Sequence, residues 1–129
     1  MTVELKPISL TVDAVAIDAY AKITGDFNPI HTDSEFAAKS PMGGIIAHGT
    51  LSLNLIWQAI EANFGKSALE GAKLDVRFVK PVRIGDTITA TYTLNDESNR
   101  SFEVSLQNQN GESVIDGQFW IPQSNVVPN

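Results

Sequence analysis

Asp26 and His31 are the two side chains whose types and spacing are best suited to chemistry. They stand five residues apart in the segment Gly25-Asp26-Phe27-Asn28-Pro29-Ile30-His31. An Asp side chain can bond local backbone groups and Pro29 fixes one dihedral angle, so a short turn can hold both groups rigidly. A carboxylate accepts a proton and an imidazolium donates one, as general acid–base catalysis requires. The pattern also fits an ordinary turn, and the residues alone leave both interpretations open.

The chain on either side of this turn is predicted to be helical. Apolar residues recur at helical spacing from 12 to 23, with Thr11 as a candidate N-cap. The turn itself is expected to be a loop, because Asn28-Pro29 disfavours helix. A capping-box pattern that begins at Thr32 then starts a short helix ending near residue 39.

A longer helix is predicted from about His48 to Phe64. Apolar residues cover most of its circumference, and its polar residues Thr50, Asn54, Gln58 and Glu61 form one narrow stripe. A helix that is apolar nearly all round is a buried helix.

The second half of the chain changes to the two-residue period of β-strands. Strands are predicted at 72–81, 87–94, 101–109 and 113–121. Asn110-Gly111 is a strong hairpin signal, and short connections between consecutive strands require antiparallel pairing. The order of elements therefore indicates an α+β domain whose antiparallel sheet curls around one buried helix.

Composition restricts the class of protein. The 129 residues are expected to form one domain, 1–129, with a loosely ordered tail at 122–129. The absence of cysteine excludes disulfides, a thiolate nucleophile and cysteine-based metal sites. The net charge of -6 argues against nucleic-acid binding. No signal peptide or membrane span is expected, so the protein is predicted to be soluble and cytoplasmic.

The sequence resembles the MaoC-like, or (R)-specific enoyl-CoA hydratase, family from about residue 10 to 121. Three segments carry the resemblance: Ile-Thr-Gly-Asp-Phe-Asn-Pro-Ile-His at 23–31, Gly-Ile-Ile-Ala-His-Gly at 44–49, and Val-Arg-Phe-Val-Lys-Pro-Val-Arg-Ile-Gly-Asp-Thr at 76–87. The Asp-x-Asn-Pro-x-His core with a downstream His-Gly is highly specific. It implies a hotdog fold, a curved antiparallel sheet wrapped around a long central helix, in agreement with the pattern above.

The resemblance implies that Asp26 and His31 activate the water that adds to the β-carbon of a trans-2-enoyl thioester, the reverse reaction being dehydration. In the family a backbone N–H polarises the thioester carbonyl, and here that N–H belongs to Gly49. The first N–H groups of a helix lack internal partners, which suits this task, although a plain helix-start glycine is the alternative. No metal or redox cofactor is implied, and the CoA thioester is the substrate.

Three further polar residues have roles that the sequence leaves open. His48 is expected to orient the loop, with direct catalysis as the alternative. Asn28 supports the loop or orients the water. Asn54 stands where hydratases of the family often have a small hydroxyl residue. It either bonds Asp26 or the water, or is a satisfied buried amide.

The expected partner is an acyl-CoA. Its phosphates call for a cationic patch, for which the candidates are Lys39, Lys73, Arg77, Lys80 and Arg83. Lys80 and Arg83 are the first choice, and ordinary solvated charges are an equally good interpretation of each. An acyl-carrier-protein thioester is less favoured, because an acidic carrier would meet a net charge of -6. A homodimer or a higher even-numbered homo-oligomer is expected, since pairing would cover an open sheet edge.

The sequence offers two alternative functions. A hotdog acyl-CoA thioesterase needs an acidic residue on or beside the central helix, where the only acid, Glu61, is near the far end. A non-catalytic acyl-thioester-binding protein would not require both Asp26 and His31. The sequence does not define the acyl chain, the direction of reaction or the pathway, although Phe27, Trp57, Phe64 and Trp120 are candidates for lining the pocket.

Overall fold

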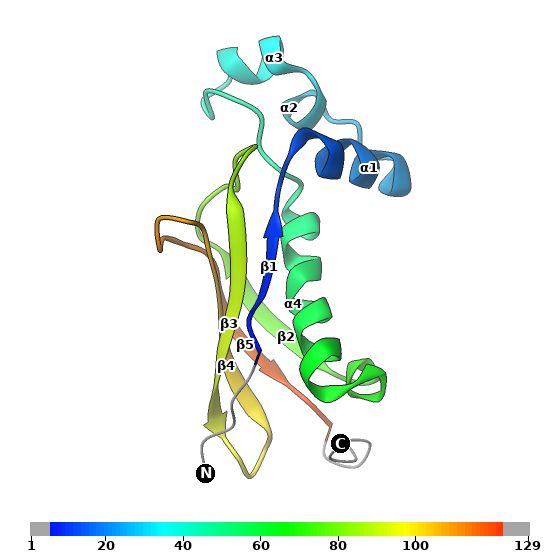
Figure 1. Cartoon of the computed structure of the whole chain (residues 1–129), viewed down its shortest axis with the longest axis vertical. Coiled ribbons are helices and arrows are strands. Elements are labelled where there is room, and N and C mark those ends of the chain that lie inside the picture. Colours follow the sequence, from blue (N-terminus) through cyan, green and yellow to red (C-terminus); the bar gives the residue numbers. More distant parts are fainter. Residues whose placement is uncertain (1–5, 123–129) are drawn as a thin grey trace.

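The computed structural model describes residues 6–122, in which one helix lies along a face of an antiparallel sheet (Figure 1). The strands, all paired antiparallel in the order β1-β3-β4-β5-β2, are β1 (Ile8–Thr11), β2 (Lys73–Phe78), β3 (Thr87–Asp96), β4 (Ser101–Gln107) and β5 (Ser113–Trp120). The helices are α1 (Ala14–Thr24), α2 (Pro29–Thr32), α3 (Ser34–Lys39), α4 (Gly49–Phe64) and the 3-10 turn η1 (Lys66–Leu69).

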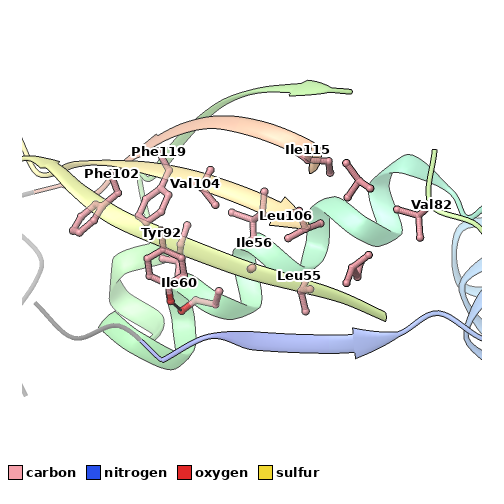
Figure 2. Close-up of a cluster of buried hydrophobic side chains, with 14 of the residues drawn as sticks. Leu55, Ile56, Ile60, Val82, Tyr92, Phe102, Val104, Leu106, Ile115 and Phe119 are labelled. Atoms are coloured by element: carbon pink, nitrogen blue, oxygen red, sulfur yellow. Dashed lines mark hydrogen bonds between the residues drawn. The ribbon is translucent and has the colours of Figure 1, made fainter. Parts of the chain in front are cut away.

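The core lies between α4 and the inward face of the sheet (Figure 2). Leu55, Ile56 and Ile60 of α4 are buried against inward-facing residues of the central strands. These strand residues are Ile88, Ala90, Tyr92, Val104, Leu106, Ile115 and Phe119. In β3 and β4 they alternate with less buried residues, as the period of two predicts, whereas no residue of β5 is exposed. The predicted α+β hotdog fold, with its central buried helix, is therefore confirmed.

The polar stripe of α4 is exposed at Thr50, Asn54 and Gln58, whereas Glu61 is half-buried. This agrees with a helix whose opposite face packs on the sheet. None of the helices in residues 6–122 is long and apolar enough to span a membrane.

The start of the chain differs from the prediction. Ile8–Thr11 forms β1, which pairs with the first half of β3. Thr11 is therefore a strand residue, and Asp13 caps α1 instead by accepting the N–H of Ala16 at 2.8 Å. A four-residue strand has too few alternations for its period to be recognised. Most of the predicted tail at 122–129 lies outside the described residues.

The apolar stripe predicted for the first helix is also wrong in part. Val15 and Ile23 are 76% and 81% exposed, and α1 buries Ile17 and Ala21 instead. A helix rich in alanine has a weak apolar stripe, so packing rather than the stripe decides which side faces the protein.

The turn predicted between the first two helices contains the one-turn helix α2, which begins at Pro29. A proline is tolerated at the first helical position because the N–H that it lacks would have no partner there. Asp33, rather than Thr32, then caps α3 by accepting the N–H groups of Glu35 and Phe36. The helices α1, α2 and α3 lie together at one end of the sheet, beside the start of α4 (Figure 1). This end holds the residues predicted to do chemistry.

Candidate active site

The loop that carries Asp26 is built from successive turns closed by side chains. Gly25 ends α1 in the left-handed conformation at φ 75, which glycine adopts without strain. Oδ1 of Asp26 accepts the N–H of Asn28 at 3.2 Å, and Oδ1 of Asn28 accepts the N–H of Ile30 at 3.1 Å. Asn28 thus supports the loop, which is one of its two expected roles, and the orientation of water by Asn28 stays a prediction. Within residues 6–122, the second carboxylate oxygen of Asp26 has no hydrogen bond and is free for chemistry.

His31 is half-buried and held by one backbone carbonyl. Its Nδ1 lies 2.7 Å from the carbonyl oxygen of Ile46. A carbonyl oxygen only accepts, so Nδ1 must carry the proton and Nε2 is the nitrogen left for exchange with a ligand. The Ile46 N–H in turn bonds the carbonyl of Ile30 at 3.3 Å, which joins this segment to α2.

His48 connects the loop to the start of α4. It is 2% exposed, and its Nε2 donates to the backbone carbonyl of Asp26 at 2.9 Å. Its ring stacks on His31 with centroids 4.0 Å apart and meets the edge of Tyr20 at 5.0 Å. This geometry agrees with the expected role of orienting the loop.

Asp26, His31 and His48 converge: a carboxylate oxygen of Asp26 and one ring nitrogen of each histidine all lie within 4.8 Å of one another. Two groups that bond the same water are separated by roughly 4.5 Å. The spacing of a carboxylate and an imidazole here therefore suits the activation of one water.

The same three residues are a set that a metal ion could use. A bound ion must lie in the plane of each imidazole, about 2 Å from its nitrogen. The two rings are stacked with only 27° between their planes, so their lone pairs do not converge on one point. The arrangement fits acid–base chemistry better than metal binding.

Gly49 is the first residue of α4, and its N–H belongs to the turn that lacks internal partners. A Cβ at this position would lie 3.1 Å from Cε1 of Phe78, tighter than ordinary contact. Glycine therefore lets the Phe78 ring pack on the start of the helix. Close packing of the Phe78 ring is therefore one reason for glycine at position 49. The expected binding of a thioester carbonyl to the Gly49 N–H is a second reason, and the two are compatible.

A cavity of about 320 Å³ opens between the start of α4 and the chain that follows β2. Its lining is mainly apolar and consists of Met42, Gly49, Ser52, Phe78, Val79, Lys80, Pro81, Val82 and Ile115. Such a wall suits an acyl chain. None of the four large residues predicted to line the pocket belongs to it.

Phe78 is not among the residues predicted to line the pocket, although the strand period contains a signal for it. Leu74, Val76 and Phe78 alternate along β2 and so lie on one face of the sheet. Of the predicted aromatic residues, Phe64 packs in the core, 5.1 Å from Phe102 between ring centroids, while Phe27 is exposed on the loop.

The remaining predicted residues lie at the edges of this region. Asn54 is exposed, and no hydrogen bond joins its side chain to Asp26 in the part of the chain that the structure describes. Lys80 lines the cavity and pairs with Glu112, and this hydrogen bond is the main cause that lowers the pKa of the Glu112 carboxyl. Nη1 of Arg83 donates to the carbonyl of Met42 at 2.5 Å, beside the same cavity.

Comparison with known proteins decides the family. Residues 2–115 match the model of the MaoC-like domain. The chain belongs to the MaoC-like family. It is 32% identical to a 3-hydroxybutyryl-CoA dehydratase of Methylorubrum extorquens over 77% of this chain and 65% of that protein. It is 31% identical to nodulation protein N of Rhizobium leguminosarum over 93% of this chain and 83% of that protein.

A solved structure agrees with the family assignment. The R-hydratase PhaJ1 from Pseudomonas aeruginosa superposes with a TM-score of 0.79 at 27% identity, covering 92% of this chain and 78% of that one. This MaoC-like chain spans less than two thirds of the length of the Methylorubrum dehydratase and of other curated relatives. The Methylorubrum protein is named a dehydratase and PhaJ1 a hydratase, which is consistent with lyase chemistry on this scaffold.

Proposed function

We propose that this MaoC-like protein catalyses the reversible addition of water to a trans-2-enoyl-CoA, giving an (R)-3-hydroxyacyl-CoA. The observation that carries the proposal is the convergence of Asp26 and His31 within 4.8 Å beside the start of α4. The hydratases and dehydratases among its relatives support the same reaction class.

The chemistry follows from the free atoms of the two residues. The Asp26 carboxylate takes a proton from water, and the oxygen adds to Cβ of the substrate. The π electrons of the Cα=Cβ double bond move toward the thioester carbonyl, which becomes an enolate, while the Cα–Cβ single bond remains. Protonated His31 then donates from Nε2 to Cα, and transfer of the water's proton from Asp26 to His31 restores both groups.

The enolate oxygen requires a hydrogen-bond donor, and the N–H of Gly49 is the proposed one. It opens α4, where the helix dipole adds partial positive charge. Stabilising the charge that develops in the transition state is a large contribution to such reactions. This role requires no metal or redox cofactor.

The proposed substrate is the CoA thioester rather than an acyl-carrier-protein thioester, in view of the net charge of -6. Lys80 and Arg83, on either side of Pro81-Val82 by the cavity, are proposed to meet the CoA phosphates. The protein is further proposed to act as a cytoplasmic homodimer or higher even-numbered oligomer, in which pairing covers an edge strand.

A crotonyl-CoA assay distinguishes the possible functions. The purified chain is expected to reduce the enoyl absorbance without releasing free thiol, and the product should be the (R)-hydroxyacyl-CoA on chiral analysis. Release of thiol would identify a thioesterase instead. Saturable binding of acyl-CoA with neither change would identify a non-catalytic binding protein.

A further inference from the structure

Ser52 carries a buried polar group that no interaction within the described residues satisfies. It lies one turn into α4 and is only 2% exposed, and its Oγ has no hydrogen-bond partner in residues 6–122. A serine inside a helix ordinarily bonds the carbonyl four residues earlier. Here the carbonyl of His48 instead accepts the N–H groups of Leu51 and Ser52, at 3.1 and 3.5 Å. Leaving a buried hydroxyl unsatisfied is unfavourable, so a ligand that accepts its proton would be favoured.

The position of Ser52 directs this hydroxyl toward the proposed carbonyl site. Gly49 and Ser52 are three residues apart, so they share a face of α4, and both line the 320 Å³ cavity. Helical side chains tilt toward the N-terminus, which points Ser52 back at the first turn. Gly49 has no side chain to stand between the hydroxyl and a ligand bound at its own N–H.

The other groups on the cavity wall do not offer an equivalent donor. The lining side chains are apolar apart from Ser52 and Lys80, and Lys80 pairs with Glu112. The Phe78 ring covers Gly49 and is 58% exposed, so it can turn toward solvent without leaving a packed core. A ligand that displaces this ring would reach the start of α4.

We propose that the Ser52 hydroxyl is a second hydrogen-bond donor to the thioester carbonyl oxygen, beside the N–H of Gly49. This inference rests on the proposed function. An enolate oxygen can accept two donors, and each donor stabilises the charge that appears on it during the reaction. Ser52 then contributes mainly to the chemical step, because the bond strengthens as the charge develops.

Substitution of Ser52 in the full chain tests this role with two independent readouts. The first is kcat for crotonyl-CoA hydration. The second is the infrared stretching frequency of the isotope-labelled thioester carbonyl of bound butyryl-CoA, which cannot be hydrated. Ser52→Ala is expected to lower kcat by about 100-fold with little change in KM, and to raise the carbonyl frequency. Ser52→Cys, a weaker donor of similar size, should give values of kcat and of the carbonyl frequency between those of the parent and of Ser52→Ala. Gln58→Ala, on the exposed face of α4, should give the parental values of both.

The outcomes separate this inference from the proposed function. Parental kcat and an unchanged carbonyl frequency in Ser52→Ala would overturn the role of Ser52 while leaving the hydratase intact. If the parent binds butyryl-CoA but does not hydrate crotonyl-CoA, the proposed function fails and the frequency shift still decides whether Ser52 donates. Failure to bind either thioester would overturn both.

Discussion

Two backbone carbonyls determine which nitrogen of His31 and of His48 is free. The carbonyl of Ile46 requires a proton on Nδ1 of His31, and the carbonyl of Asp26 requires one on Nε2 of His48. The exchangeable nitrogen of His31 is therefore Nε2. His48 uses its own Nε2 to hold the backbone of the loop that carries Asp26, so the two stacked rings make different contacts.

The role of His48 can be tested by keeping its donor and removing its ring. Gln places an amide N–H near the position of the imidazole Nε2, so His48→Gln should keep the bond to the Asp26 carbonyl and retain kcat within about threefold. His48→Ala loses the bond, and the displaced loop should lower kcat by about 100-fold. The measurement is kcat for crotonyl-CoA hydration. Equal losses in both variants would show that the ring itself, rather than its N–H, is required.

For single residues, the sequence allowed predictions where the residues concerned lie close together along the chain. Asp26 and His31 could be proposed as candidates because one turn holds both and the segment resembles the MaoC-like family, and the His48-Gly49 pair became a candidate through the same resemblance. Ser52 could not be recognised, because its role depends on a cavity between α4 and the chain after β2 that the sequence does not specify. For Phe78 the alternation with Leu74 and Val76 indicated the face of β2, but not its contact with Gly49. The interpretation of Asn54 as a buried amide is wrong, because its side chain is exposed, and a bond from Asn54 to the water stays a prediction.

Among the elements, α4 and β3 are joined by a buried phenol. The Tyr92 hydroxyl donates to the carbonyl of Ala59 at 2.9 Å and also contacts the side-chain amide of Asn63. Burial raises the pKa of Tyr92 from its ordinary 10.0 to about 12. The central helix is thus fixed to the sheet by a polar contact as well as by apolar packing.

This pKa makes stability depend on alkaline pH. Between about pH 10 and about 12 the unfolded chain loses the phenol proton while the folded chain keeps it. The unfolded state then binds fewer protons, so the free energy of unfolding should fall as pH rises through that window. Urea unfolding of the parent and of Tyr92→Phe would measure the difference. If both lose stability equally across the window, Tyr92 is not the cause.

The contact between β5 and β2 depends on the absence of a side chain at Gly117. A Cβ there would collide with the carbonyl oxygen of Asp75 and lie 2.6 Å from Cα of Val76, both backbone atoms. Gly117→Ala is therefore expected to lower the free energy of unfolding by about 3 kcal/mol.

Gly44 provides the matched control for that substitution. A Cβ at Gly44 would approach nothing closer than Nη1 of Arg83 at 3.9 Å, so Gly44→Ala should change stability by less than about 0.5 kcal/mol. Chemical denaturation of both variants measures the two effects. A stable Gly117→Ala protein would mean that β2 can move away from β5 at little cost.

Elements with long, regular periods could be predicted, and short or ambiguous ones could not. The all-round apolar helix and the alternating strands fixed the fold class, whereas the four residues of β1 gave no usable period. The predicted strand 72–81 ends at Phe78, because the N–H groups of Val79 and Lys80 both bond the carbonyl of Val114 and leave the ladder.

At the scale of the whole molecule, the net charge favours a CoA thioester over an acyl-carrier-protein thioester as the substrate. The net charge of -6 should repel an acidic carrier protein at long range, whereas CoA needs only a local patch. We expect kcat/KM to be higher for crotonyl-CoA than for the crotonyl carrier-protein thioester at low salt. The difference in kcat/KM between the two substrates should become smaller at higher salt, because salt screens the repulsion between the protein and the acidic carrier. A preference for the carrier protein at low salt would contradict this choice of substrate.

The most direct test of the proposed mechanism is the turnover number of Asp26→Asn with crotonyl-CoA. Asn has nearly the same shape and keeps an oxygen for the N–H of Asn28, so the loop should be preserved while the base is lost. The rate is expected to fall by about 1,000-fold, with Asp33→Asn, which retains its capping oxygen on α3, as the matched control. Hydration by Asp26→Asn at the parental rate would show that Asp26 is not the base.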